Sequence, residues 1–144
     1  MTIGLAQRLA PALMVLALAA PVAAVDTGTP VPQLSEARAD IDAEAWDSAI
    51  AKLKLIVDAD NTNADAYNLL GYALRHTGAN ERAMQAYTRA LTLDPQHTGA
   101  LEYQGVLFVI LGDLDKANAN LDKIQAICGT SCEEYEDLAE AIKG

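Results

Sequence analysis

The sequence predicts an all-α protein, and three observations support this fold class. Alanine, the residue with the highest helix propensity, occurs 28 times among the 144 residues. Aromatic residues that favour strands are scarce, with a single Phe and a single Trp. A period of 34 residues recurs along the chain after residue 34, which is typical of a repeated helical unit. We therefore expect helices that pair and stack in the order of the sequence.

The charge balance excludes two classes of partner. The chain carries 10 Lys and Arg against 20 Asp and Glu, for a formal net charge of −10 and a pI near 4.4. A nucleic-acid binder needs a basic face to neutralise phosphates, and docking on anionic lipid needs one as well. The 51% of hydrophobic residues also excludes a disordered chain.

Residues 1–24 have the pattern of a secretory signal peptide. Arg8 is the only charged residue of the segment, and the apolar run Leu9–Ala24 follows it and ends in small residues. We expect cleavage before Val25, export to the periplasm or the medium, and no membrane insertion afterwards. The alternative is an uncleaved anchor, but the run has two prolines and falls short of the roughly 20 residues that span a bilayer.

The remaining chain divides into a lead-in, three units and a final helix. Residues 25–33 contain two prolines and a glycine and predict a flexible lead-in. The units are 34–63, 64–97 and 98–131, and 132–144 is a capping helix with its acids on the outer face. Within the units we expect the helix pairs 34–42 and 46–59, 64–77 and 80–93, 98–111 and 114–127. Gly78 and Gly112 suit the turns, and Pro95 stops a helix.

Residues spaced by 34 carry a family resemblance. Gly71 pairs with Gly105, Gly78 with Gly112, and a small residue recurs at Ala49, Ala83 and Ala117. The middle unit, 64–97, resembles the tetratricopeptide repeat (TPR) family, and the resemblance extends over residues 34–131. We identify the chain as similar to a small exported bacterial member. The signature positions of this unit are Tyr67, Leu70, Gly71, Gly78, Ala83, Tyr87, Ala90 and Pro95.

The resemblance implies a fold and a function. The fold would be an α-solenoid of three TPR hairpins plus the capping helix. The first helices of the hairpins would line a concave groove for a protein or peptide partner, as in an exported scaffold or adaptor. By this resemblance the groove residues are Arg38, Ile41, Asp42, Asp65, Asn68, Tyr72, Arg75, His76, Glu102, Val106, Val109 and Ile110.

One stretch of the expected groove has unusual chemistry. Gly105–Leu111 is apolar on every side, which predicts burial on every side. We expect Leu107, Phe108 and Leu111 to pack within the solenoid, and Val106, Val109 and Ile110 to form an apolar hot spot. Tyr72, Arg75 and His76 would add polar anchors for a partner with an apolar segment beside an acid or a backbone acceptor. Two alternatives stay open: a homo-oligomer that associates through Val106–Ile110, or coverage of this face by the lead-in or the capping helix.

No residue pattern predicts catalysis, a cofactor or a metal site. His76 and His97 stand apart, and the motifs of hydrolases, metalloproteases and phosphate-binding loops are missing from the sequence. The acidic stretch Asp58–Asp65 resembles a calcium loop superficially. It lacks the central glycine and has Leu69 where a bidentate Glu closes such loops. We expect it to be a turn between two units.

Cys128 and Cys132 are the only cysteines, and they lie between the last hairpin and the capping helix. In an oxidising compartment so close a pair predicts a disulfide that holds the capping helix. Free thiols, or a redox or metal role, are the alternatives, although a metal site would need two further soft ligands.

Overall fold

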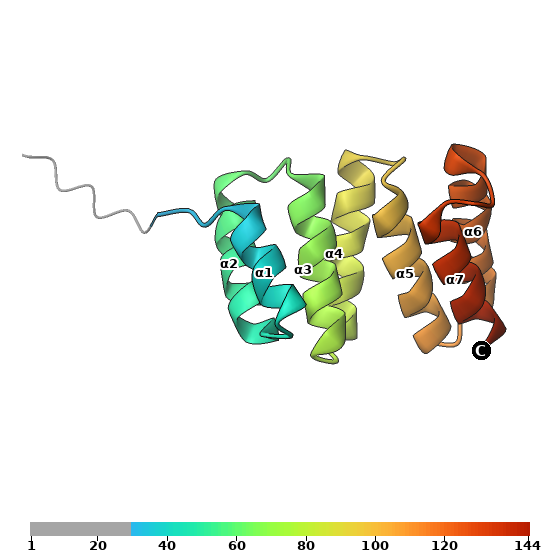
Figure 1. The fold of residues 1–144 in the computed structure, drawn as a ribbon, viewed down its shortest axis with the longest axis horizontal. Helices are drawn as coiled ribbons and strands as arrows, with labels where there is room; N and C mark the ends of the chain where they lie inside the picture. Colours follow the sequence, from blue (N-terminus) through green and yellow to red (C-terminus); the bar gives the residue numbers. More distant parts are fainter. Residues whose placement is uncertain (1–29) are drawn as a thin grey trace, which may run out of the picture.

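The computed structural model describes residues 30–144, and this part of the chain contains seven helices and no strand (Figure 1). The predicted signal peptide and most of the lead-in lie outside the described residues. No helix within 30–144 is long and apolar enough to cross a membrane. The helices are α1 Leu34–Asp42, α2 Trp46–Ala59, α3 Ala64–His76, α4 Asn80–Leu93, α5 Thr98–Ile110, α6 Leu114–Cys128 and α7 Glu133–Lys143.

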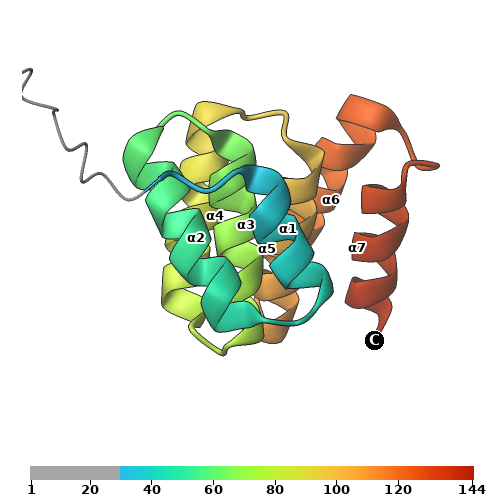
Figure 2. The ribbon, with the colours of Figure 1, turned by 60° about the vertical axis from the view of Figure 1, so that its left-hand side comes forward.

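The helices form three hairpins that stack side by side in chain order. In Figures 1 and 2, α1 pairs with α2, α3 with α4, and α5 with α6, while α7 packs against both α5 and α6. This arrangement confirms the prediction of an all-α fold built from repeated helix pairs. The helix bounds agree with those expected from the sequence to within one residue at each end.

Local sequence explains where the helices begin and end. Gly78 and Gly112 have φ angles of 78° and 79°, so each supplies the left-handed residue that follows a helix. Glu44 stands 34 residues before Gly78 and takes the same left-handed region with φ 55°, although it has a side chain. The side chains of Asn63 and His97 accept backbone N–H groups at the starts of α3 and α5.

Small residues set the distance between paired helices. A Cβ atom on Gly71 would come within 2.6 Å of the Tyr87 ring, which is fully buried between α3 and α4. Ala49 and Ala83, at equivalent positions in their hairpins, are fully buried as well. Gly105 plays a different part, because its Cβ would meet Leu138 of α7 at 2.6 Å. The final helix therefore closes directly onto α5.

The C-terminal end of α5 departs from the prediction. Leu107 is fully buried and Phe108 is half-buried, but Leu111 is 55% exposed. The expectation that Leu111 packs within the solenoid is wrong. The helix ends at Ile110, and Leu111 is its capping residue just before the Gly112 turn, where the chain has already left the core.

Candidate functional site

Two adjacent cavities follow the face formed by α1, α3, α5 and α7. The first has a volume of about 240 Å³ and reaches α7, and the second has a volume of about 330 Å³ and lies toward α1. Arg38, Leu69 and Tyr103 line both cavities, so we describe the two together as one groove. The first helix of every hairpin contributes to its lining.

The first cavity, which we call the acidic cavity, has a strong charge bias. Five carboxylates line it, and Arg38 is the only Lys or Arg side chain among its lining residues. The acids come from three different helices. They are Asp65 of α3, Glu102 of α5, and Glu133, Glu134 and Asp137 of α7.

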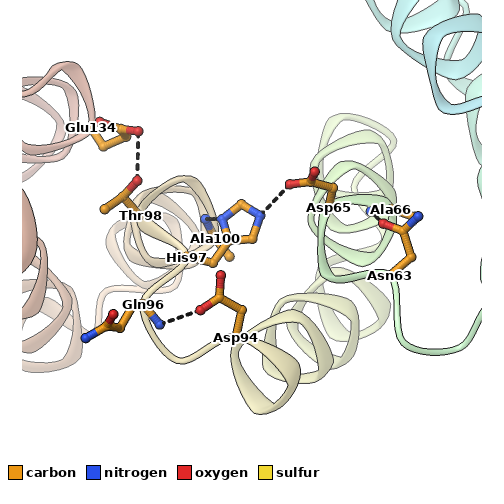
Figure 3. A network of polar contacts seen from close by, with 9 residues as sticks. All are labelled: Asn63, Asp65, Ala66, Asp94, Gln96, His97, Thr98, Ala100 and Glu134. Atoms are coloured by element: carbon orange, nitrogen blue, oxygen red, sulfur yellow. Dashed lines mark hydrogen bonds and ion pairs between the residues drawn. The ribbon is translucent and has the colours of Figure 1, made fainter.

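Hydrogen bonds fix two of these acids in place, as Figure 3 shows. The His97 Nδ1 atom accepts the Ala100 backbone N–H at 3.1 Å, so the ring proton lies on Nε2 and is donated to Asp65 Oδ1 at 3.0 Å. The Thr98 hydroxyl donates to Glu134 Oε1 at 2.8 Å. The N-terminal end of α5 is thereby tied to α3 on one side and to α7 on the other (Figure 3).

Among the cavity residues, Glu102 has the pKa that is shifted furthest from its ordinary value. Its side chain is buried among the α7 acids, and burial together with the Asp137 and Glu134 charges raises its pKa to about 8. Arg75 works in the opposite direction and lowers this pKa. At neutral pH the Glu102 carboxyl therefore holds a proton in the unliganded protein.

Asn68 is a second buried polar group in this cavity. Asn68 is 6% exposed, and its buried Oδ1 atom has no hydrogen-bond partner in the part of the chain that the structure describes. Gly99 borders this side chain, since a Cβ at Gly99 would lie at van der Waals distance, 3.4 Å, from the Asn68 Nδ2 atom. An unpaired buried amide oxygen costs stability, so its position needs an explanation.

The second cavity, the apolar cavity, is mainly hydrophobic and aromatic. Its lining residues other than Arg38 and Asp42 are Ile41, Leu69, Tyr72 and Tyr103. The Tyr72 and Tyr103 rings are 4.7 Å apart, and burial followed by the Glu102 charge raises the pKa of Tyr103 to about 12. The two tyrosines thus join the apolar and acidic parts of the groove.

An aromatic stack extends from Tyr72 to the first hairpin. The His76 ring lies 4.5 Å from Tyr72 and stacks on Trp46 of α2 at 4.3 Å. Partial burial and the neighbouring Arg75 charge lower the pKa of His76. The Arg75 guanidinium lies 5.2 Å from the centre of the Tyr72 ring, and its Nε atom is buried without an acceptor.

Comparisons with known proteins agree with this fold. The tetratricopeptide repeat family model matches residues 64–97. The structure is similar to that of MamA, with a TM-score of 0.68 and 28% identity over 77% of this chain and 65% of that one. The chain contains a tetratricopeptide repeat and has the fold of TPR proteins.

Two further similar proteins differ in the share of their length that this chain covers. A rat (Rattus norvegicus) FK506-binding protein-like sequence is 37% identical over 65 residues, which are 45% of this chain and about a fifth, 19%, of the rat protein. PcrH, solved in complex with the chaperone-binding region of PopD, gives a TM-score of 0.65 and 22% identity over 76% of this chain and 81% of that one. The chain thus spans somewhat less than two thirds of the MamA chain and a small part of the rat protein.

The TPR groove brings only some of the sequence-predicted residues together. Arg38, Asn68 and Tyr72 line the cavities, whereas Arg75 and His76 are engaged in the aromatic stack beside them. The three apolar candidates of α5 line neither cavity. Val106 packs against the cluster of Leu101, Ile124 and Leu138, Val109 is half-buried, and Ile110 is 55% exposed.

The acids of α7 are the main groove residues that sequence reasoning misplaced. The expectation that they occupy an outer face is wrong for Glu133, Glu134 and Asp137, which line the acidic cavity. Their spacing places them on one side of a helix, but only the packing of Leu138 against Gly105 turns that side toward the groove. Tyr103 was also missed, because its neighbour Glu102 occupies the predicted groove position.

The other two candidate features are local. The sulfur atoms of Cys128 and Cys132 lie 2.09 Å apart, at disulfide-bonding distance. They form a three-residue group with Glu134, but paired sulfurs are not free thiolates for a metal. In the acidic stretch, Asp60 Oδ1 accepts the Thr62 backbone N–H at 3.0 Å, so this carboxylate stabilises the turn between α2 and α3.

Proposed function

We propose that this TPR protein is a scaffold that binds a peptide segment of a protein partner in the groove. The observation that carries the proposal is the groove itself, where an aromatic cavity adjoins an acidic cavity whose buried Asn68 oxygen has no hydrogen-bond partner within residues 30–144. Apolar surface supplies affinity, and polar groups of this kind supply orientation and specificity. PcrH, which has a similar fold, was solved with a segment of its partner PopD.

A peptide selection followed by mapping tests the proposal. Peptides enriched from a random display library on the full chain should shift the backbone amide resonances of α1, α3, α5 and α7. Tyr103→Ala should weaken their binding at least 10-fold, because Tyr103 lines both cavities and aromatic anchors dominate interfaces.

Leu55→Ala serves as the control, since Leu55 lies on α2 and is 41% exposed. This variant should bind the selected peptides like the parent protein. Peptides that map to α2, α4 and α6, or a library without any enriched sequence, would contradict the proposal.

We also propose that the scaffold works outside the cytoplasm, on the basis of the signal-peptide pattern in residues 1–24. Protein recovered from the cell envelope should have an intact mass that begins at or near Val25. It should contain no free thiol at Cys128 or Cys132 under denaturing, non-reducing conditions. A mass that begins at Met1, or two free thiols, would contradict export into an oxidising compartment.

A second candidate function is self-association through the predicted Val106–Ile110 face. Exposed apolar side chains favour it: Ile110 and Leu111 are each 55% exposed, and Leu114 of the next helix is 47% exposed. Light scattering coupled to size exclusion should then report a dimer or larger species that Ile110→Asp converts to monomers. A monomeric parent protein at high concentration would exclude this candidate.

A further inference from the structure

The acidic cavity has more negative side chains than positive ones to balance them. Asp65, Glu102, Glu134 and Asp137 converge on it from three helices. His97 bonds to Asp65, and Arg38 is the only Lys or Arg side chain among the described lining residues. Like charges held together in a partly enclosed space repel one another, so the arrangement lowers the stability of the unliganded fold. Such a cost is typical of sites whose partner supplies the missing charge.

Two buried groups show where that charge would lie. Within residues 30–144, the Oδ1 atom of Asn68, which is 6% exposed, has no hydrogen-bond partner, and Glu102, which is 9% exposed, makes no ion pair. Both are acceptors when Glu102 is ionised, and both line the same cavity. A cationic N–H donor can satisfy both acceptors and also offsets the negative charge of the surrounding carboxylates, which a neutral donor does not do and an anion would make worse.

We infer that the acidic cavity binds a cationic side chain of the partner peptide, a lysine ammonium or an arginine guanidinium, which pairs with Glu102 and donates to the Asn68 amide oxygen. This inference rests on the proposed function and specifies the chemistry of the partner. It replaces the expectation of an acid on the partner. Arg75, which motivated that expectation, lines neither cavity and packs on Tyr72.

The adjoining apolar cavity extends the recognised motif. Ile41, Leu69 and Tyr72 lie beyond Tyr103, which borders both cavities. A peptide that places its cation beside Glu102 therefore presents its neighbouring residues to a hydrophobic and aromatic surface. The motif is a basic residue next to an apolar one.

Binding of the cation is coupled to a proton. Glu102 holds its proton near neutral pH, so pairing with a cation releases that proton to solvent, and affinity rises with pH until the free carboxyl is ionised. The titratable and charged groups around Glu102 are Arg75 and Asp65 of α3, Glu133, Glu134 and Asp137 of α7, and His97 and Tyr103, which line the same cavity. Arg38 of α1 borders the same cavity.

Four blocked amino acids test the inference without knowledge of the partner. The N-acetyl, N-methylamide derivatives of lysine, arginine, norleucine and glutamate are titrated into the 15N-labelled full chain at pH 6 and pH 8.5. The readouts are the Asn68 side-chain amide and the Gly99 backbone amide. We expect saturable shifts with the lysine or arginine probe, at least 10-fold weaker binding of norleucine, and tighter binding of the cation at pH 8.5. The tighter of the two cationic probes identifies the preferred side chain.

Matched variants locate the site. Glu102→Gln should weaken binding of the cationic probe at least 10-fold and remove its pH dependence. If that variant folds poorly, Asp137→Asn takes its place and should weaken binding several-fold. Glu140→Gln removes a charge from an exposed position of α7 that does not line the cavity, and should change binding by less than two-fold.

Three results would overturn the inference: equal binding of norleucine, preference for glutamate, or no shift with either cation. Its failure is distinct from that of the proposed function. If display-selected peptides occupy the groove without a basic residue and the cationic probes do not bind, the inference falls and the scaffold proposal stands.

Discussion

Replacing Glu102 by Gln should stabilise the protein at alkaline pH and leave its stability unchanged in acid. Burial raises the pKa of the folded carboxyl to about 8 from an ordinary value of 4.5. The unfolded chain therefore loses this proton at lower pH than the folded protein does, and unfolding becomes more favourable as pH rises from 4.5 to 8. Gln has nearly the same shape and does not ionise, so the variant escapes this penalty.

The shift sets the size of the effect. At about 1.4 kcal/mol per pKa unit, the difference between 4.5 and about 8 gives a ceiling of about 5 kcal/mol above pH 8. Water admitted through the cavity mouth relaxes part of the penalty, and we expect Glu102→Gln to gain about 1 to 3 kcal/mol at pH 8.5. The gain should shrink to zero below pH 4.5, where both folded and unfolded wild-type chains carry the proton.

Urea denaturation followed by circular dichroism at pH 4, 7 and 8.5 measures this difference. The control is Glu140→Gln, which removes a charge from an exposed position of the same chain and should change the free energy of unfolding by less than about 0.5 kcal/mol at each pH. If the difference in unfolding free energy between Glu102→Gln and wild type does not change from pH 4 to 8.5, the raised pKa of Glu102 is refuted.

Three further perturbations test the fold. Glu44→Gly should raise the free energy of unfolding by about 0.5 to 1 kcal/mol in urea denaturation, because Glu44 has φ 55° and glycine adopts this region without strain; a loss would contradict this. Gly71→Ala should lower it by about 1 to 3 kcal/mol in the same assay, since the new Cβ would lie 2.6 Å from the Tyr87 ring; an unchanged midpoint would show that α3 and α4 separate freely. The fluorescence of Trp46, the single tryptophan, should titrate with His76 at a midpoint below 6.5, because the two rings stack at 4.3 Å and the pKa of His76 is lowered; a midpoint above 6.5 would contradict the assigned burial.

Glu44 shows that the repeat predicts the backbone conformation even where the residue type differs from the glycine of the other units. The 34-residue period aligns it with Gly78 and Gly112, and the structure gives all three the left-handed conformation after a helix. The positions of turns were predictable because they depend on a few neighbouring residues. The close approach of α3 and α4 was predictable as well, because Gly71 has no side chain that would meet the Tyr87 ring.

The candidate site was predictable only in part, because some of its residues come together through contacts between distant helices. The family pattern identifies the helix face that carries Arg38, Asn68 and Tyr72, and these residues do line the groove. The same pattern assigns Val106 to the groove, but in the structure this residue packs against the cluster that includes Leu138. The repeat pattern does not specify that Leu138 of α7 packs against Gly105 of α5, because this contact forms only in the tertiary structure.

The helix pairs, their turns and their stacking order follow from the amino-acid sequence, because propensity, capping and a 34-residue apolar period are properties of the chain itself. The chemical character of the groove depends on how distant helices pack. Asp65, Glu102 and Asp137 are each separated by 35 or more residues in sequence, yet they line one cavity because α7 closes onto α5. Burial and charge proximity arise only when those helices meet. The proton on Glu102 and the preference for a cation follow from that contact rather than from any residue alone.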